Sequence, residues 1–160
     1  MKIYDTKFIK DQFPALQRKV WDKKLVYLDS AASMQKPKRV LDSISKSYSF
    51  NYSNVHRGLH KLSEEATAKY EGSRIKVAKF INCSENEVIF TSGATAALNL
   101  VAYSWGMKNL SAGDEIIITI AEHHANIVPW QIIAEQKNVK IKAAHVDPNS
   151  EFNPDIIRDL

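Results

Sequence analysis

The sequence predicts an α/β fold with an incomplete, mainly parallel sheet and helices on both of its faces. From residue 87 onward, short apolar runs alternate with segments of helical length. This alternation is typical of parallel strands joined by right-handed crossover helices. Small and polar residues follow several of the apolar runs, as loops at a sheet edge do. Only about four strands are recognisable, which is few for a sheet with both faces covered, so we expect part of a larger domain.

Two regions are expected along the chain. Residues 1–24 form an N-terminal arm in which Pro14 interrupts a helical spacing of apolar residues, and residues 25–160 form the partial domain. The first half of that domain is expected to contain a strand, a helix, a loop and a helix, at residues 25–28, 37–48, 51–59 and 63–81. The second half is expected to contain strands at 87–91, 115–120 and 139–146, and helices at 94–105, 126–137 and from Asn153-Pro154 onward.

Composition and charge favour a globular cytoplasmic protein. With 44% hydrophobic and 25% charged residues, the chain can bury a core. The net charge of +4 is scattered, and Lys23-Lys24 is the only adjacent lysine pair, so we expect no nucleic-acid partner. Apolar runs are too short for a signal peptide or a membrane span, so no membrane partner is expected. The single cysteine, Cys83, excludes an internal disulfide and fits a reducing compartment.

A possible phosphate site lies between the strand expected at 87–91 and the helix that follows it. The segment Thr91-Ser92-Gly93-Ala94-Thr95 combines a glycine that permits a tight turn with two hydroxyls near a helix N-terminus. Exposed amides at the positive end of a helix bind phosphate well. Many such turns carry Ser, Gly and Thr only for capping, so both interpretations stay open. The pattern matches neither a P-loop nor a dinucleotide fingerprint.

Two adjacent histidines, His123 and His124, follow the strand expected at 115–120. Ligands of open α/β sheets bind at the carboxyl ends of strands, where an imidazole can stack on a planar ligand or transfer a proton. The alternative is that one histidine caps the strand and the other packs. Adjacent side chains diverge and lack the spacing of a zinc pair, so we expect no metal. If the strands at 87–91 and 115–120 are parallel neighbours, both turns share an edge and fit a phosphorylated aromatic cofactor.

The loop Val55-His56-Arg57-Gly58-Leu59-His60 carries two histidines and a guanidinium. Gly58 argues against a continuous helix between the histidines, and polar loop residues are the simpler interpretation. Arg57 is able to pair with an acidic side chain or with a substrate carboxylate. Nothing in the sequence places a base beside Cys83, so we expect no reactive thiol there.

Taken together, five segments resemble the Suf-type cysteine desulfurases, which are pyridoxal 5'-phosphate (PLP) enzymes of the class V aminotransferase group. The segments are Leu28 to Pro37, Val55 to Gly58, Asn99 to Ala102, Ala112 to Asp114 and Glu122 to Asn126. The resemblance runs from about residue 10 to the end. It implies an aminotransferase-like (PLP fold type I) large domain, of which residues 25–160 would be the N-terminal part. It also implies a homodimer that converts L-cysteine to L-alanine and passes sulfur as a persulfide to a sulfur-acceptor protein for iron–sulfur cluster assembly.

The resemblance assigns roles to seven residues. His123 matches the histidine that stacks on the pyridine ring and assists proton transfer, which makes it both catalytic and cofactor-binding. The residues that match the phosphate-binding turn are Ala94 and Thr95. The residues that match substrate-binding positions are Ala31 and Ala32, near the substrate carboxylate, and His56 and Arg57, in a loop at the dimer-related edge of the site.

The sequence departs from the family pattern in two ways. The family turn usually has two threonines and a glutamate, whereas Ala94-Thr95-Ala96 lacks one hydroxyl and the carboxylate that contacts the neighbouring subunit. The Schiff-base lysine, the ring-nitrogen aspartate, the persulfide cysteine and the carboxylate-binding arginine are expected beyond residue 160, since none of the seventeen lysines, nor Cys83, matches. We therefore expect that this chain alone does not desulfurate cysteine. The alternatives are a non-catalytic fragment or interaction partner of a complementary half, or a selenocysteine lyase fragment.

Overall fold

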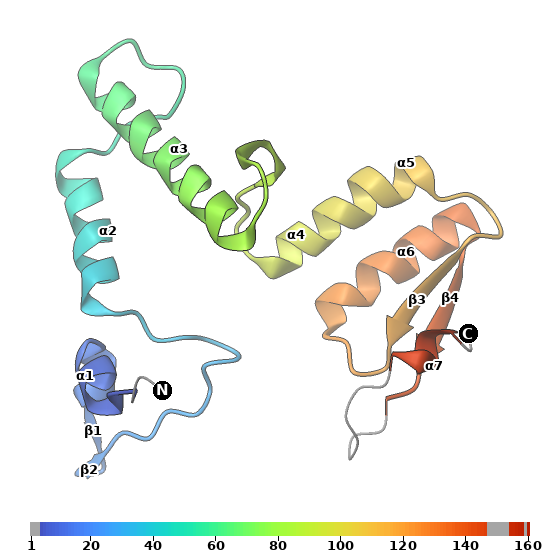
Figure 1. Ribbon diagram of the computed structural model, residues 1–160, viewed down its shortest axis with the longest axis horizontal. Helices are drawn as coiled ribbons and strands as arrows, with labels where there is room; N and C mark the ends of the chain where they lie inside the picture. The colour runs from blue at the N-terminus through green and yellow to red at the C-terminus, as the bar shows by residue number, and fades with distance from the viewer. Residues whose placement is uncertain (1–3, 147–153, 159) are drawn as a thin grey trace. The chain divides into compact units, whose positions relative to one another are not determined.

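The computed structural model describes residues 4–146, 154–158 and 160, and the chain divides into two compact units. The first unit is Met1–Val88 and the second is Ile89–Leu160 (Figure 1). The division lies inside the region 25–160 that the sequence predicted as one partial domain. None of the helices in the described residues is both long and apolar enough to cross a membrane.

The first unit is mostly helical. It contains a small antiparallel hairpin, two long helices and several short turns (Figure 1). In chain order, its elements are α1 (Thr6–Asp11), η1 (Pro14–Gln17), β1 (Lys19–Val20), β2 (Lys23–Lys24), α2 (Lys38–Phe50), α3 (Lys61–Ile81) and η2 (Glu85–Glu87). The two long helices and the loop between them lie where the sequence predicted them.

The prediction of a strand at residues 25–28 is wrong. Strand pairing occurs earlier, in the two-residue strands β1 and β2, where Trp21 and Asp22 both have positive φ angles, 50° and 60°. Two consecutive residues of that kind close a tight hairpin. The apolar run that follows has no strand partner among the described residues, and Val26 and Leu28 remain 72% and 91% exposed. An apolar run becomes a strand only where a neighbour supplies its hydrogen bonds.

The start of α3 also differs from the prediction. The helix begins at Lys61 rather than Ser63, and the imidazole of His60 caps it, with Nδ1 accepting from the Ser63 amide at 3.4 Å. Ser63 is buried, and its hydroxyl donates to the Asn54 carbonyl at 2.8 Å and accepts from the Gly58 amide at 3.0 Å. Ser63 therefore fastens the preceding loop to the helix instead of capping the helix.

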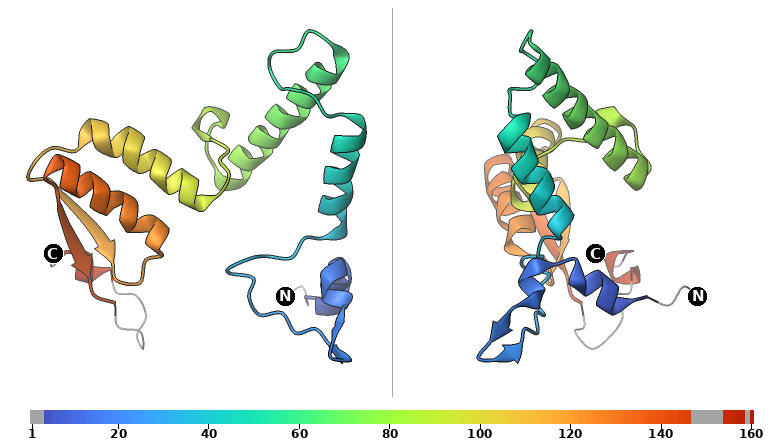
Figure 2. Two further views of the ribbon diagram at one scale, coloured as in Figure 1. Left: turned by 180° about the vertical axis from the view of Figure 1, so that it is seen from behind. Right: turned by 90° about the vertical axis from the view of Figure 1, so that its left-hand side faces the viewer.

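The second unit contains a parallel β–α–β arrangement. Its elements are α4 (Ala94–Val101), η3 (Ala102–Gly106), α5 (Met107–Asn109), β3 (Glu115–Thr119), η4 (His124–Asn126), α6 (Val128–Lys137), β4 (Lys140–Ala144) and α7 (Asp155–Arg158). β3 and β4 pair in parallel, with Glu115 opposite Lys140 and Thr119 opposite Ala144, and α6 makes the crossover (Figure 2). The strands predicted at 115–120 and 139–146 and the helix predicted at 126–137 are thus confirmed. Asn153, predicted as a helix cap, lies outside the described residues.

One core holds this unit together. Ala102, Ile133 and Val139 are buried with Leu110, and the half-buried Ile116 and Trp130 pack against them. The helix predicted at 94–105 runs on to Asn109 through the π-helical turn η3, whose Gly106 lies against Trp130. A helix, a crossover helix and a parallel strand pair therefore share one apolar centre.

The prediction of a strand at residues 87–91 is also wrong. Ser84 and Glu87 form a reciprocal capping box around η2, in which the Ser84 amide donates to Glu87 Oε2 at 2.8 Å. Val88 has extended backbone angles, but residues 88–91 pair with no strand among the described residues. Val88 is nevertheless buried, and its carbonyl accepts a hydrogen bond from the Arg74 guanidinium. A side chain thus satisfies one backbone group of a segment that has no neighbouring strand.

Candidate functional site

The turn before α4 has the features of an anion site. α4 begins at Ala94 without a side-chain cap, and the first amides of a helix have no acceptor within the helix. The turn is exposed, and a Cβ built on Gly93 would meet no atom within 4 Å. Gly93 itself is extended, with φ 160° and ψ 177°, so the tight glycine turn that the sequence predicted is not what shapes this segment. Ala94 and Thr95 are exposed, and their amides, at the start of α4, have no acceptor within the helix.

His123 begins the turn that leads into α6. Its ring caps η4, because Nδ1 accepts a hydrogen bond from the Ala125 amide at 3.1 Å. The side chain is exposed. The His124 ring lies 6.3 Å away, centroid to centroid, at an interplanar angle of 86°. The two rings therefore meet edge-on, whereas adjacent side chains were expected to diverge.

The structure brings the Gly93 turn and the His123 turn together within the second unit. α4 contacts η4, and α4 and α6 begin at the same end of the unit in both views (Figures 1 and 2). Ala94 and Thr95 open the first of these helices, and His123 immediately precedes the second. Free amides and an exposed imidazole at one end of a β–α–β unit form a site that suits a planar, phosphorylated ligand.

A hydrogen-bonded chain that sequence reasoning missed supports the His123 turn. Trp130 Nε1 donates to Asn126 Oδ1 at 3.1 Å, and Asn126 Nδ2 donates to Glu122 Oε2 at 2.9 Å. Thr119 Oγ1 donates to the second carboxylate oxygen of Glu122 at 3.0 Å. The hydrogen bonds from Asn126, and then from Thr119, hold the pKa of Glu122 below its ordinary value. The spacing of four between Glu122, Asn126 and Trp130 was the available signal.

The other predicted site residues belong to the first unit. Ala31 and Ala32 lie in an exposed turn that is closed by the Ser33 amide, which donates to the Asp29 carbonyl at 3.0 Å. The Tyr27 hydroxyl spans the same turn and donates to the carbonyls of Asp29 and Ser33. This small-residue turn is therefore held closed by its own tyrosine while its alanines stay accessible.

His56 is more firmly held than a polar loop residue needs to be. Its φ is +70°, a conformation that costs a residue with a Cβ some free energy. Its amide donates to Thr67 Oγ1 at 2.9 Å, its Nε2 lies 3.3 Å from a Glu71 carboxylate oxygen, and its ring meets Tyr70 edge-on. Three residues of helix α3 thus contact His56. Arg57 is exposed, and no ion pair of its guanidinium occurs within the described residues.

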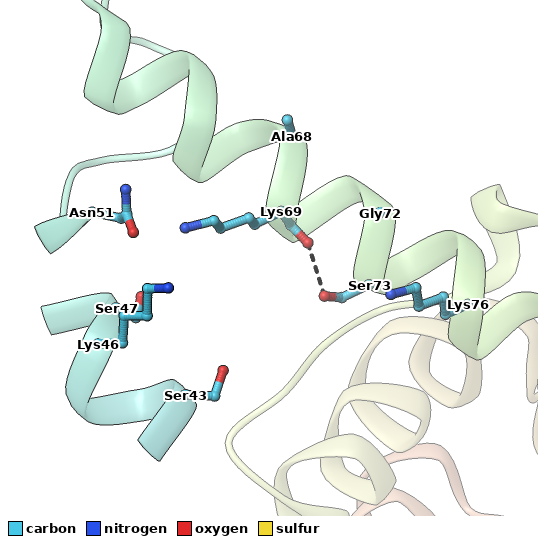
Figure 3. A pocket seen from close by; sticks show the side chains of 9 residues that line it. All are labelled: Ser43, Lys46, Ser47, Asn51, Ala68, Lys69, Gly72, Ser73 and Lys76. Carbon is cyan, nitrogen blue, oxygen red and sulfur yellow. Dashed lines mark hydrogen bonds between the residues drawn. The ribbon is translucent and has the colours of Figure 1, made fainter. Parts of the chain in front are cut away.

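A separate hollow of about 570 Å³ lies between α2 and α3 of the first unit (Figure 3). Three lysines line it, Lys46, Lys69 and Lys76, together with serines such as Ser73, whose hydroxyl donates to the Lys69 carbonyl at 2.8 Å. None of the residues that the sequence predicted for a site lines this hollow. Among the described residues, no group of three His, Cys, Asp or Glu side chains is placed to hold a metal ion.

Comparison with known proteins identifies relatives over nearly the whole chain. The family described as "Aminotransferase class-V" matches residues 26–160. A probable cysteine desulfurase of Synechocystis sp. is 48% identical over 95% of this chain and 36% of its own length. A probable cysteine desulfurase of Vibrio cholerae is 50% identical over 95% of this chain and 38% of its own length. The chain therefore spans somewhat more than a third of the length of these relatives.

A solved structure gives the same result at the level of the fold. The apo structure of a cysteine desulfurase from Thermococcus onnurineus matches 98% of this chain and 38% of its own, with a TM-score of 0.86 and 30% identity. The chain therefore has the N-terminal part of the fold type I architecture, and the α/β fold class predicted from the sequence is confirmed.

Proposed function

Because the chain belongs to the class-V aminotransferase family, we propose that it supplies part of the PLP site of a cysteine desulfurase of the Suf type. The observation that carries this proposal is the uncapped start of α4 beside the His123 turn in one unit. The proposal is supported by relatives that share about half of their aligned residues with this chain and are described as probable cysteine desulfurases. Residues 25–160 are, on this proposal, the N-terminal part of the enzyme's large domain.

The second unit has the groups needed to hold the cofactor. The amides of Ala94 and Thr95, with the Thr95 hydroxyl, hold the phosphate, and the helix dipole of α4 favours its charge. His123 would contact the pyridine ring and would carry its proton on Nε2, since its Nδ1 accepts a hydrogen bond from the Ala125 amide. PLP, when bound, supplies an electron sink for the bonds at the substrate's α-carbon.

The first unit provides the proposed substrate contacts. Ala31 and Ala32 are proposed to contact the substrate near its carboxylate, and His56 and Arg57 are proposed to belong to a loop at the dimer-related edge of the site, as the family resemblance implies. The partners proposed with this activity are L-cysteine, a second copy of the enzyme and a sulfur-acceptor protein. The proposal places the Schiff-base lysine and the persulfide cysteine outside residues 1–160, because none of the lysines here, nor the half-buried Cys83, matches.

The proposal is tested by titrating the isotope-labelled chain with pyridoxine 5'-phosphate, which lacks the aldehyde and so does not react with surface lysines. The amide resonances of Ala94 and Thr95 and the ring resonances of His123 are expected to shift together. Pyridoxine without phosphate serves as the ligand control and should leave the two amides unmoved. Perturbations confined to other residues, or none at all, would contradict the proposed site.

A matched pair of variants sharpens this titration. Thr95→Ala removes a hydroxyl donor to the phosphate, and a hydrogen bond to a charged group is worth about 1.5 kcal/mol, or roughly tenfold in affinity. Thr6→Ala makes the same change in the first residue of α1, where no ligand is proposed, and is expected to leave the affinity unchanged. Equal affinities of both variants and the parent chain would remove Thr95 from the site.

A further inference from the structure

The chain Thr119–Glu122–Asn126–Trp130 has only one possible direction of hydrogen bonding. An indole N–H is a donor only, and a carboxylate is an acceptor only. Asn126 lies between them, so its oxygen must face Trp130 and its nitrogen must face Glu122. The Trp130 Nε1–Asn126 Oδ1 distance is 3.1 Å, and the Asn126 Nδ2–Glu122 Oε2 distance is 2.9 Å. The orientation of this amide is therefore fixed by chemistry, and both of its polar ends are satisfied.

The same chain closes the turn that presents His123. Glu122 precedes His123, and Asn126 follows it by three residues. The backbone N–H of Asn126 donates to the backbone carbonyl of His123 at 2.8 Å. Thr119 is the last residue of β3, and Trp130 lies in the first turns of α6. The turn is thus fastened at one side to the end of the strand and at the other side to the helix.

Trp130 connects the turn to the core of the second unit. Its ring packs against the buried cluster that contains Ile133, and a Cβ built on Gly106 would come within 3.1 Å of Trp130 Cζ3. The indole is therefore confined by η3 on one side and its own helix on the other. Because the ring is confined, its N–H is a fixed anchor for Asn126 and, through Asn126, for Glu122.

We propose that Glu122, Asn126 and Trp130 are positioning residues that hold the His123 ring in one orientation, with Nδ1 accepting from Ala125 and the proton on Nε2. The purpose of this arrangement rests on the proposed function, in which His123 meets the cofactor. The geometry does not depend on the cofactor and is testable without it. None of the three positioning residues needs to touch the ligand.

The test measures the side-chain rotamer of His123 in the labelled chain without ligand, from its Hα–Hβ couplings, and the protonation of its two ring nitrogens, from their chemical shifts. The parent chain is expected to show one large and one small coupling and an unprotonated Nδ1. Glu122→Ala should average the two couplings, because the turn loses both of its carboxylate bonds. Glu122→Gln should keep one rotamer, since its oxygen accepts from Asn126 and its NH₂ faces the Thr119 hydroxyl, which also accepts.

Two controls separate positioning from general loss of structure. Glu135→Ala makes the same truncation at an exposed site on α6 and is expected to leave the His123 couplings unchanged. Trp130→Phe keeps an aromatic ring in the core and removes the N–H together with part of the indole's volume, so it should also average the couplings, and the amide pattern of β3 and β4 shows whether the core persists. Averaged couplings in the parent chain, or a single rotamer in Glu122→Ala with β3 and β4 intact, would overturn the proposal. Because no ligand is added, these results stand apart from the pyridoxine phosphate titration.

Discussion

At the scale of single residues, the half-buried carboxylate of Glu122 is an ionisable group that accepts two of the hydrogen bonds holding the His123 turn. Hydrogen bonds from Asn126 and Thr119 lower its pKa in the folded chain. A lowered pKa means that the folded state favours the ionised form, so the stabilisation is complete above the ordinary value near 4.5 and is lost as pH falls through the lowered value. The contribution of the ionised carboxylate to stability should therefore be lost in acid.

This linkage gives a first prediction. The difference in free energy of unfolding between the parent chain and Glu122→Gln should be largest above about pH 5 and should shrink towards zero as the carboxylate is protonated. Urea unfolding at a series of pH values measures it. A difference that grows as the pH falls would reverse the sign and contradict the assigned hydrogen bonds.

A second prediction concerns His56, whose positive φ suits glycine better than any residue with a Cβ. His56→Ala and His56→Gly remove the same contacts with Glu71 and Tyr70, but only alanine retains the backbone strain. The glycine variant should therefore be more stable than the alanine variant by roughly 1 kcal/mol. Thermal unfolding of both variants checks this order, and a more stable alanine variant would show that residue 56 does not adopt this conformation.

At the scale of elements, the loop before α3 depends on the close approach of Gly58 to Ser63. A Cβ on Gly58 would lie 2.4 Å from Ser63 Cβ, whereas a Cβ on Gly72, within α3, would meet nothing within 4 Å. We predict opposite effects of one substitution. Gly58→Ala should destabilise the chain and expose the Gly58 amide to hydrogen exchange. Gly72→Ala should stabilise α3 by up to about 1 kcal/mol, and destabilisation by both, or by neither, would contradict this packing.

The elements also show how far the sequence alone could be interpreted. β3, α6 and β4 were predictable, because each apolar run has its partner within the same short segment. The runs at 25–28 and 87–91 have comparable composition but no strand partner in the described residues, and composition does not reveal whether a partner exists. His123 could be proposed from the sequence because it follows a strand. Asn126 and Trp130 could not, because their role depends on hydrogen bonds between side chains that only the structure shows.

At the scale of the whole molecule, the chain spans somewhat more than a third of its relatives, and the proposed reaction needs groups that these residues do not offer. We predict that the 160-residue chain, incubated with PLP and L-cysteine, releases no sulfide and forms no alanine. A sulfide assay, with an intact cysteine desulfurase as the positive control, measures this. Sustained turnover by the chain would show that a lysine within these residues serves the reaction.

The central claim is that one end of the second unit holds the phosphate and the ring of the same ligand. Magnetisation transfer between the ring protons of bound pyridoxine 5'-phosphate and those of His123 tests it most directly, with His124 as a control in the same spectrum. We predict contacts from the ligand ring to His123, accompanied by shifts of the Ala94 and Thr95 amides. Contacts to His124 alone, or ligand contacts that leave both amides unmoved, would contradict the claim.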